Sequence, residues 1–284
     1  MVQNEAAMKI DRVDLPEFEN PPVVEVALSI KFKTLNLTTA HVGLLWERFR
    51  SQFPKVEDQP PLDLPIETEQ ERVPAQFSEQ LRLLSLPRMR SWFVSSSGTQ
   101  LIQVQHDLFA HNWRRNDTDE TYPRFDAVRT SFAKELQTLK QFLTEQDLGE
   151  PEPVQCEVTY INHIFAGRTW QTHDELHKVF NLWTAPKHEF LPPPDDGRFL
   201  VRYVIPDPRG KFCGRLHIST QPAFTEVAGA EKLLLATTLT ARGRPLGEGL
   251  AGALEFLELG HVWIVCGFAD VTTREIQNEW RRRR

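Results

Sequence analysis

The chain has 284 residues, of which 40% are hydrophobic and 25% are charged, and its formal net charge is −6. This is the composition of an ordinary folded protein, which excludes global disorder, and the length allows one large domain or two halves of ordinary size. A negative chain needs a local basic patch to bind a phosphate backbone, so nucleic acid is not the partner that we expect.

The cysteines and the start of the chain indicate a compartment. Cys156, Cys213 and Cys266 are odd in number, far apart and each within an apolar run, so we expect free thiols in a reducing cytoplasm. Residues 1–22 form a polar lead-in without the apolar core of a signal peptide. We see no apolar stretch near the roughly 20 residues that cross a bilayer, so we expect a soluble cytoplasmic protein and no membrane partner.

Hydrophobic periodicity divides residues 23–149 into a strand, a helix, a proline-rich acidic loop, three strands and a second helix. Apolar and polar side chains alternate up to Phe32, as in a half-buried strand, and Thr38 or Thr39 is a suitable N-cap for the helix that follows. The later elements are expected as a loop at 54–74, strands at 80–86, 91–95 and 99–114, and a helix that opens at Tyr122.

The same order of elements recurs in residues 150–284. We expect a strand at 154–164, a short helix at 174–183, a second proline-acid loop, strands at 199–205, 212–220 and 232–241, and a helical region from Leu250 to Trp280. We interpret the recurrence as an internal duplication. The predicted fold class is α+β, with tandem strand-helix-three strands-helix halves that form antiparallel sheet and pack their helices on one face.

Two short motifs resemble known sites without meeting their physical requirements. The stretch GEGLAG at 247–252 matches a dinucleotide-binding pattern, but no strand follows its helix, so close packing explains the glycines better. In HDELH at 173–177 the glutamate is displaced by one position from its place in zinc proteases, and a polar helix face is the simpler interpretation. We expect no metal, no cofactor and no catalytic residues from these patterns.

Asn112 and Asn162 attract attention because asparagine is disfavoured in strands, and both lie beside large aromatic residues in strands that look half-buried. A buried amide must find partners or cost on the order of 1–3 kcal/mol. Each therefore either satisfies a backbone group or forms a polar spot that a partner or ligand recognises. The candidate binding residues that we take from these strands are Trp92, His106, Asn112, Trp113, Tyr160 and Asn162.

Four segments carry a family resemblance. NPPVVEV at 20–26, GTQLIQVQHDLFAHNWR at 98–114, YPRF at 122–125 and YINHI at 160–164 resemble a sporadically distributed, uncharacterised bacterial protein family whose members are of about this length. The resemblance is densest in the first half and loose in the second. It implies no biochemical activity, and the patchy distribution implies at most mobile or antiphage-defence gene neighbourhoods.

Taken together, these patterns favour a non-enzymatic protein-interaction or scaffold protein, whose open sheet face or proline-rich loops bind another protein. A homo-oligomer is compatible with this hypothesis. A small-molecule-binding or hydrolytic protein, with a cavity between a curved sheet and a helix, is the alternative. A saddle-shaped sheet that binds nucleic acid is a second alternative, which must overcome the charge of −6.

Overall fold

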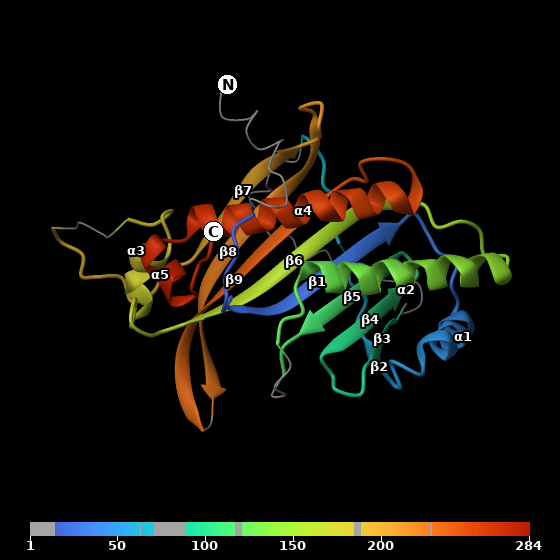
Figure 1. Cartoon of the computed structure of the whole chain (residues 1–284), viewed down its shortest axis with the longest axis horizontal. Coiled ribbons are helices and arrows are strands. Elements are labelled where there is room, and N and C mark those ends of the chain that lie inside the picture. Colours follow the sequence, from blue (N-terminus) through green and yellow to red (C-terminus); the bar gives the residue numbers. More distant parts are fainter. Residues whose placement is uncertain (1–14, 63, 71–88, 117–120, 185–188, 228) are drawn as a thin grey trace.

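The computed structural model describes residues 15–62, 64–70, 89–116, 121–184, 189–227 and 229–284 (Figure 1). Within these ranges the chain forms one antiparallel sheet of nine strands, together with helices, so the predicted α+β class and the antiparallel sheet are confirmed. The strands are β1 (Val23–Phe32), β2 (Lys55–Gln59), β3 (Arg90–Val94), β4 (Gln100–Gln105), β5 (Leu108–Arg114), β6 (Pro153–Phe165), β7 (Phe199–Pro206), β8 (Phe212–Val227) and β9 (Ala230–Gly243). The helices are α1 (Thr39–Phe49), α2 (Phe125–Glu145), α3 (Leu176–Val179), α4 (Gly249–Val271) and α5 (Arg274–Glu279), with a 3-10 turn, η3 (His173–Glu175), before α3.

The strand order places the first strand of each half at the centre of the sheet. The order is β2-β3-β4-β5-β1-β6-β9-β8-β7, so β1 and β6 pair with each other and each half continues outward through its later strands in reverse order. The β1–β6 pair is antiparallel, with Leu28 opposite Val158. One continuous hydrogen-bonded sheet therefore joins the two predicted halves, residues 23–149 and 150–284.

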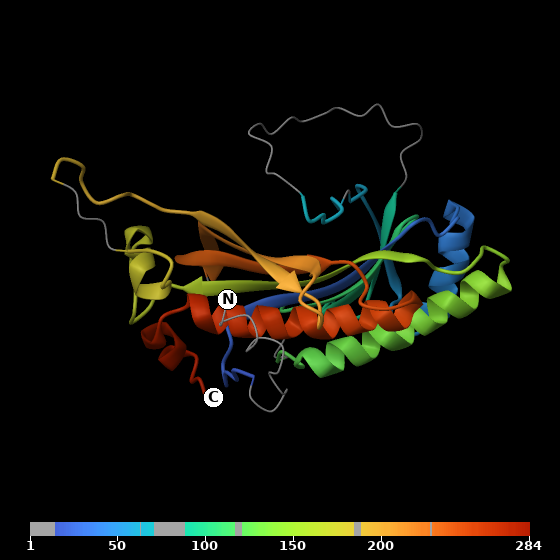
Figure 2. The same ribbon diagram turned by 90° about the horizontal axis from the view of Figure 1, so that it is seen from above.

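The long helices α2 and α4 lie side by side (Figure 2), and they contact the sheet at β5 and β1 and at β6 and β9, respectively. Phe132 of α2 stacks on Phe109 of β5. In α4, Gly260 allows a close approach to the sheet, because an added Cβ would meet Val158 Cγ2 at 3.2 Å and Ala241 Cβ at 3.1 Å. Side chains alternate between the two faces along each strand. One face, which we call the apolar face, carries core residues such as Leu28 and Val158, and the other, the polar face, carries Glu157, Arg242 and Arg215 on neighbouring strands.

Some of the predicted element boundaries in the first half agree with the structure, and others differ from it. Thr38, one of the two predicted N-caps, caps α1, and its side chain accepts a hydrogen bond from the backbone N–H of His41. The predicted strand at 99–114 is instead a hairpin, because His106 and Asp107 form a turn between β4 and β5. The expected loop at 54–74 begins with strand β2, which pairs with β3, so that part of the prediction was wrong. The predicted strand at 80–86 lies outside the described residues.

In the second half, the predicted helix at 174–183 is realised only as η3 and the single turn of α3. Strands β8 and β9 are longer than expected, and they pair from Gly214 opposite Gly243 to Val227 opposite Ala230. Helix α4 runs unbroken for 23 residues. At the ends of the sheet, β2 is short and charged, whereas β7 carries the exposed apolar side chains Leu200 and Val204.

Candidate functional site

A segment of residues 60–62 and 64–70, which we call the strap, leaves β2 and crosses the polar face of the sheet (Figure 2). Gln59 at the end of β2 pairs directly with Arg90 at the start of β3, so the chain departs from between two neighbouring strands. Two such strands need only a short turn to connect them. The excursion across the sheet is therefore a feature that the connection itself does not require.

Side chains of the sheet hold the main chain of the strap at its first part. The amide of Gln105 accepts from the N–H of Leu62 at 2.8 Å and donates to the carbonyl of the same residue at 3.0 Å. Lys31 on β1 donates to the carbonyl of Leu64 at 2.7 Å. These contacts recognise backbone groups and are independent of the side chains that the strap carries.

Gln155, at the start of β6, binds the next part of the strap in the same way as Gln105 binds Leu62. Its amide nitrogen donates to the carbonyl of Pro65 at 2.9 Å, and its amide oxygen accepts from the N–H of Glu67 at 2.6 Å. Gln155 is buried. Two glutamines of the sheet thus bind the strap as a neighbouring strand would, with one donor and one acceptor each.

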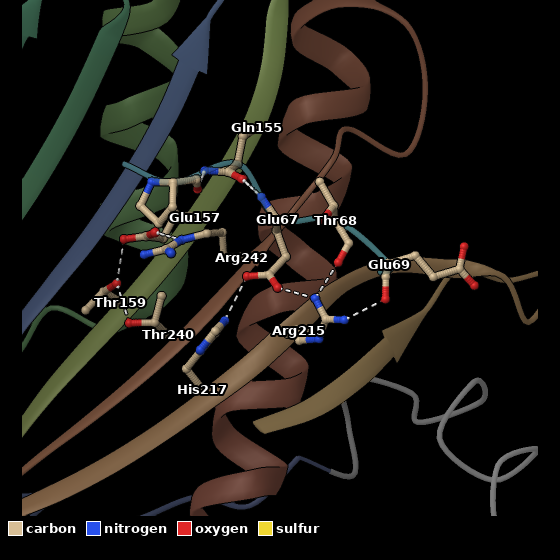
Figure 3. Close-up of polar contacts among 11 residues, drawn as sticks. Glu67, Thr68, Glu69, Gln155, Glu157, Thr159, Arg215, His217, Thr240 and Arg242 are labelled. Carbon is tan, nitrogen blue, oxygen red and sulfur yellow. Dashed lines mark hydrogen bonds and ion pairs between the residues drawn. The ribbon is translucent and has the colours of Figure 1, made fainter. Parts of the chain in front are cut away.

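The strap ends in a buried charge cluster on β8 (Figure 3). The carboxylate of Glu67, whose side chain is only 2% exposed, forms an ion pair with Arg215 and accepts from Nε2 of His217 at 2.8 Å. Arg215 also donates to the carbonyls of Thr68 and Glu69, at 2.7 and 3.0 Å. One guanidinium therefore anchors three consecutive residues of the strap through its fixed fork of donors.

Next to this cluster the polar face continues with paired groups. Nε of Arg242 on β9 donates to the carboxylate of Glu157 on β6 at 2.5 Å, and the same carboxylate accepts from the hydroxyl of Thr159 (Figure 3). The hydroxyls of Thr159 and Thr240 lie 2.9 Å apart. The floor beside the strap is thus hydrogen-bonded and polar.

Two of the predicted binding residues, Trp92 and Asn112, lie on this polar face in the first half. Nε1 of Trp92 donates to the side chain of Gln103 at 3.1 Å, and Gln103 donates to the amide oxygen of Asn112 at 2.7 Å. Asn112 in turn donates to Glu25 at 2.5 Å, and the guanidinium of Arg90 lies over the Trp92 ring. Asn112 therefore belongs to a side-chain network rather than to a backbone cap. His106, a third predicted residue, lies apart at the β4–β5 turn.

The other three predicted residues, Trp113, Tyr160 and Asn162, lie on the apolar face. The hydroxyl of Tyr160 is 2.9 Å from the hydroxyl of Tyr122 and 3.0 Å from Nδ1 of His261 on α4. Trp113 packs against the ring of Tyr122 with centroids 5.1 Å apart. Asn162 donates to the backbone carbonyl of Thr237 at 3.3 Å. The six predicted residues therefore form no single site.

A cavity of about 280 Å³ opens beside the Tyr122–Tyr160–His261 chain, between the sheet, the start of α2 and α4. Tyr160 and Asn162 line it, as do Tyr122 of the YPRF segment and Pro21 of the NPPVVEV segment. Burial raises the pKa of Tyr122 to about 12 and raises that of Tyr160 well above its ordinary value. Both phenols are therefore neutral at physiological pH.

The two short motifs have structural explanations. An added Cβ on Gly252 would meet backbone atoms of Gly247 at 2.2 Å, and the N–H of Leu246 donates to the carbonyl of Gly252, so the loop folds tightly on the first turn of α4. Nε2 of His173 lies 3.1 Å from the backbone carbonyl of Leu234, within the fold. Within the described part of the chain, no group of three or more histidine, cysteine or acidic side chains is arranged to hold a metal ion.

Helix α4 departs from what the sequence led us to expect of apolar stretches. Of the described helices, it alone is long and apolar enough, by length and composition, to cross a membrane. The core helix of a soluble protein passes the same test, and α4 packs along β6 and β9.

The cysteines are buried or half-buried, and burial raises the pKa of the Cys213 thiol to about 12, which makes that group a poor nucleophile.

The fold and the sites define an α+β protein with one nine-stranded antiparallel sheet in the described ranges, whose polar face holds a segment of its own chain. No family model matches the sequence, and neither a curated protein nor a solved structure matches it.

Proposed function

We propose that the protein is an interaction protein that binds an extended, acidic segment of a partner protein along the track now occupied by the strap. The observation that carries the proposal is the mode of strap binding. Side chains of Gln105, Lys31 and Gln155 engage main-chain groups, and Arg215 with His217 engages one carboxylate. Such a track accepts many extended sequences, provided that an acidic residue stands at the position of Glu67.

The strap is suited to displacement because its large apolar residues are only partly buried. The side chains of Leu62 and Ile66 remain 37% and 47% exposed. Segments with few buried apolar contacts are drawn from the least stable end of a structure, and they open without global unfolding. The strap then acts as an internal competitor, which the partner must replace.

Charge complementarity defines the partner. Near the end of the strap, Lys211 and Arg244 line a surface hollow together with Glu67 and Glu69. Arg215 and His217 add two further basic side chains, of which Arg215 is only 8% exposed. A partner segment that brings a carboxylate to Arg215 restores the buried ion pair, whereas a neutral segment leaves the guanidinium without its counterion.

A synthetic peptide with the sequence of residues 60–70 tests the proposal in trans. The tethered strap competes at an effective concentration on the order of millimolar, so the wild-type chain should bind the labelled peptide weakly. In Glu67→Gln the strap loses its carboxylate while the peptide keeps it. We expect the peptide to bind this variant at least about tenfold more tightly than it binds the wild-type chain, measured by fluorescence anisotropy.

Glu69→Gln is the matched control, because Glu69 contacts Arg215 through its backbone carbonyl. Peptide binding to this variant should stay at the wild-type level. Adding Arg215→Gln to Glu67→Gln should abolish binding, and hydrogen exchange over residues 64–69 should be faster in Glu67→Gln than in the control. Absence of peptide binding to Glu67→Gln, or equal binding after loss of Arg215, would contradict the proposal.

We also propose that the two halves arose by duplication and that the helices pack on a common face. In both halves the later strands follow outward in reverse order from the first strand, with five described strands in the first half and four in the second, and this order and the antiparallel pairing of β1 with β6 support the proposal. The contact between α2 and α4, in which Phe125 stacks on His261 with centroids 3.9 Å apart, is also consistent with it.

A further inference from the structure

The cavity beside Tyr160 combines apolar walls with a few polar residues. Val23, Leu239 and Ile264 are almost fully buried and form part of its wall, with Phe18 and Phe268. Its lining also includes the polar residues Tyr122, Tyr160, Asn162 and His261. Small-molecule sites combine these two features, an apolar enclosure and a few placed hydrogen-bonding groups.

The hydrogen-bonded chain can serve a ligand in two ways. If His261 accepts at Nδ1, Tyr160 donates to it, Tyr122 donates to Tyr160, and the oxygen of Tyr122 can accept from a ligand. If Nδ1 carries the proton, each bond reverses, and Tyr122 can donate to a ligand. A change of histidine tautomer therefore changes the role that Tyr122 offers, without any movement of the rings.

The charges at the rim of the cavity are balanced. Arg124 and Arg284 line it together with Glu17 and Asp126, and Nη2 of Arg284 donates to Glu17 at 2.9 Å. Two cations beside two carboxylates give neither an anion nor a cation a clear advantage. The two phenols add no further charge, because both are neutral.

We propose that this cavity binds a small, uncharged, mostly apolar molecule that bears one hydroxyl or carbonyl group, which hydrogen-bonds to Tyr122. The volume of about 280 Å³ lies just below the range of sites for drug-sized ligands, so the ligand is a compact one. The inference stands apart from peptide binding, because the cavity lies on the apolar face of the sheet and the strap on the polar one.

2-Naphthol is a suitable probe, and 2-methylnaphthalene, with a methyl group in place of the hydroxyl, is its matched control. We expect the wild-type full-length chain to bind 2-naphthol in a fluorescence titration. Tyr122→Phe should weaken that binding by about threefold to tenfold, which corresponds to the loss of one hydrogen bond. The same substitution should leave the binding of 2-methylnaphthalene unchanged in ligand-observed NMR.

Two further variants separate this cavity from other apolar surfaces. Tyr203→Phe makes the same chemical change in a hollow between β7 and α4, and it should leave 2-naphthol binding at the wild-type level. Val265→Phe fills the cavity from α4, and it should abolish binding of both probes while the melting temperature stays near that of the wild-type chain. Either of two results would overturn the proposal. The first is that the wild-type chain does not bind 2-naphthol at millimolar concentration, and the second is that Tyr122→Phe and Val265→Phe bind it as tightly as the wild-type chain does.

Discussion

Removal of the Glu135 carboxylate from the core should be among the most damaging single changes in the first half. Glu135 of α2 places both carboxylate oxygens 2.9 Å from Nδ1 of His111 on β5, and the two side chains are 8% and 1% exposed. Truncating one partner of a buried pair leaves the other without its counterpart. We therefore expect Glu135→Ala to lower the free energy of unfolding by about 3–5 kcal/mol.

Glu145 on the same helix provides the matched control. It forms an ion pair with Arg48, in which both side chains are at least one-third exposed, so Glu145→Ala should cost no more than about 1 kcal/mol. Equilibrium unfolding in urea measures both values. Leucine at both 111 and 135 should recover most of the loss, because a buried pair can be replaced by apolar groups. A loss in Glu135→Ala that is no larger than that in Glu145→Ala would refute the reasoning.

Two further predictions concern the backbone and pH. Gly243→Ala should destabilise the fold by about 1–3 kcal/mol in the same urea assay, since the added Cβ would meet the backbone oxygen of Cys213 at 2.2 Å. Gly43→Ala is the control, because an added Cβ on helix α1 meets open space there, and it should stabilise the fold by about 0.5–1 kcal/mol. Hydrogen bonds from the backbone N–H groups of Lys211 and Arg209 lower the pKa of Asp207 below its ordinary value of 3.8. Asp207 should therefore stabilise the fold at neutral pH and lose this effect as pH falls below about 3.8, so the melting temperatures of the wild-type chain and Asp207→Ala should converge in acid.

Periodicity predicted the parts of the fold where one face of an element is buried. Strand β1 buries every second residue from Val26 to Phe32, and α2 buries Phe125, Val128 and Phe132 at helical spacing. The turn between β4 and β5 escaped prediction because His106 and Asp107 are neither glycine nor proline, and the alternation continues through them. Strand β2 escaped because its residues are mostly exposed and charged, which resembles a loop.

The candidate sites were predictable only in part, for a physical reason. Tyr160 and Asn162 stood out as polar groups in an apolar strand, and both line the cavity. His261 lies within an apolar helix and gives no comparable signal. The contact of Glu67 with Arg215 joins residues 148 positions apart, and it depends on a register that no local pattern contains. Long-range ion pairs of this kind can be predicted only once the strand order and register of the sheet are known.

The central pairing of β1 with β6 has a consequence for synthesis on the ribosome. Strand β1 lies near the start of the chain, but its second neighbour is β6, which emerges only after α2 has been made. Until then β1 is an open edge strand of the nascent first half, although it lies at the centre of the finished sheet, and such an edge can pair with other chains. Only a short link separates α2 from β6, so the exposed interval closes soon after the helix is complete.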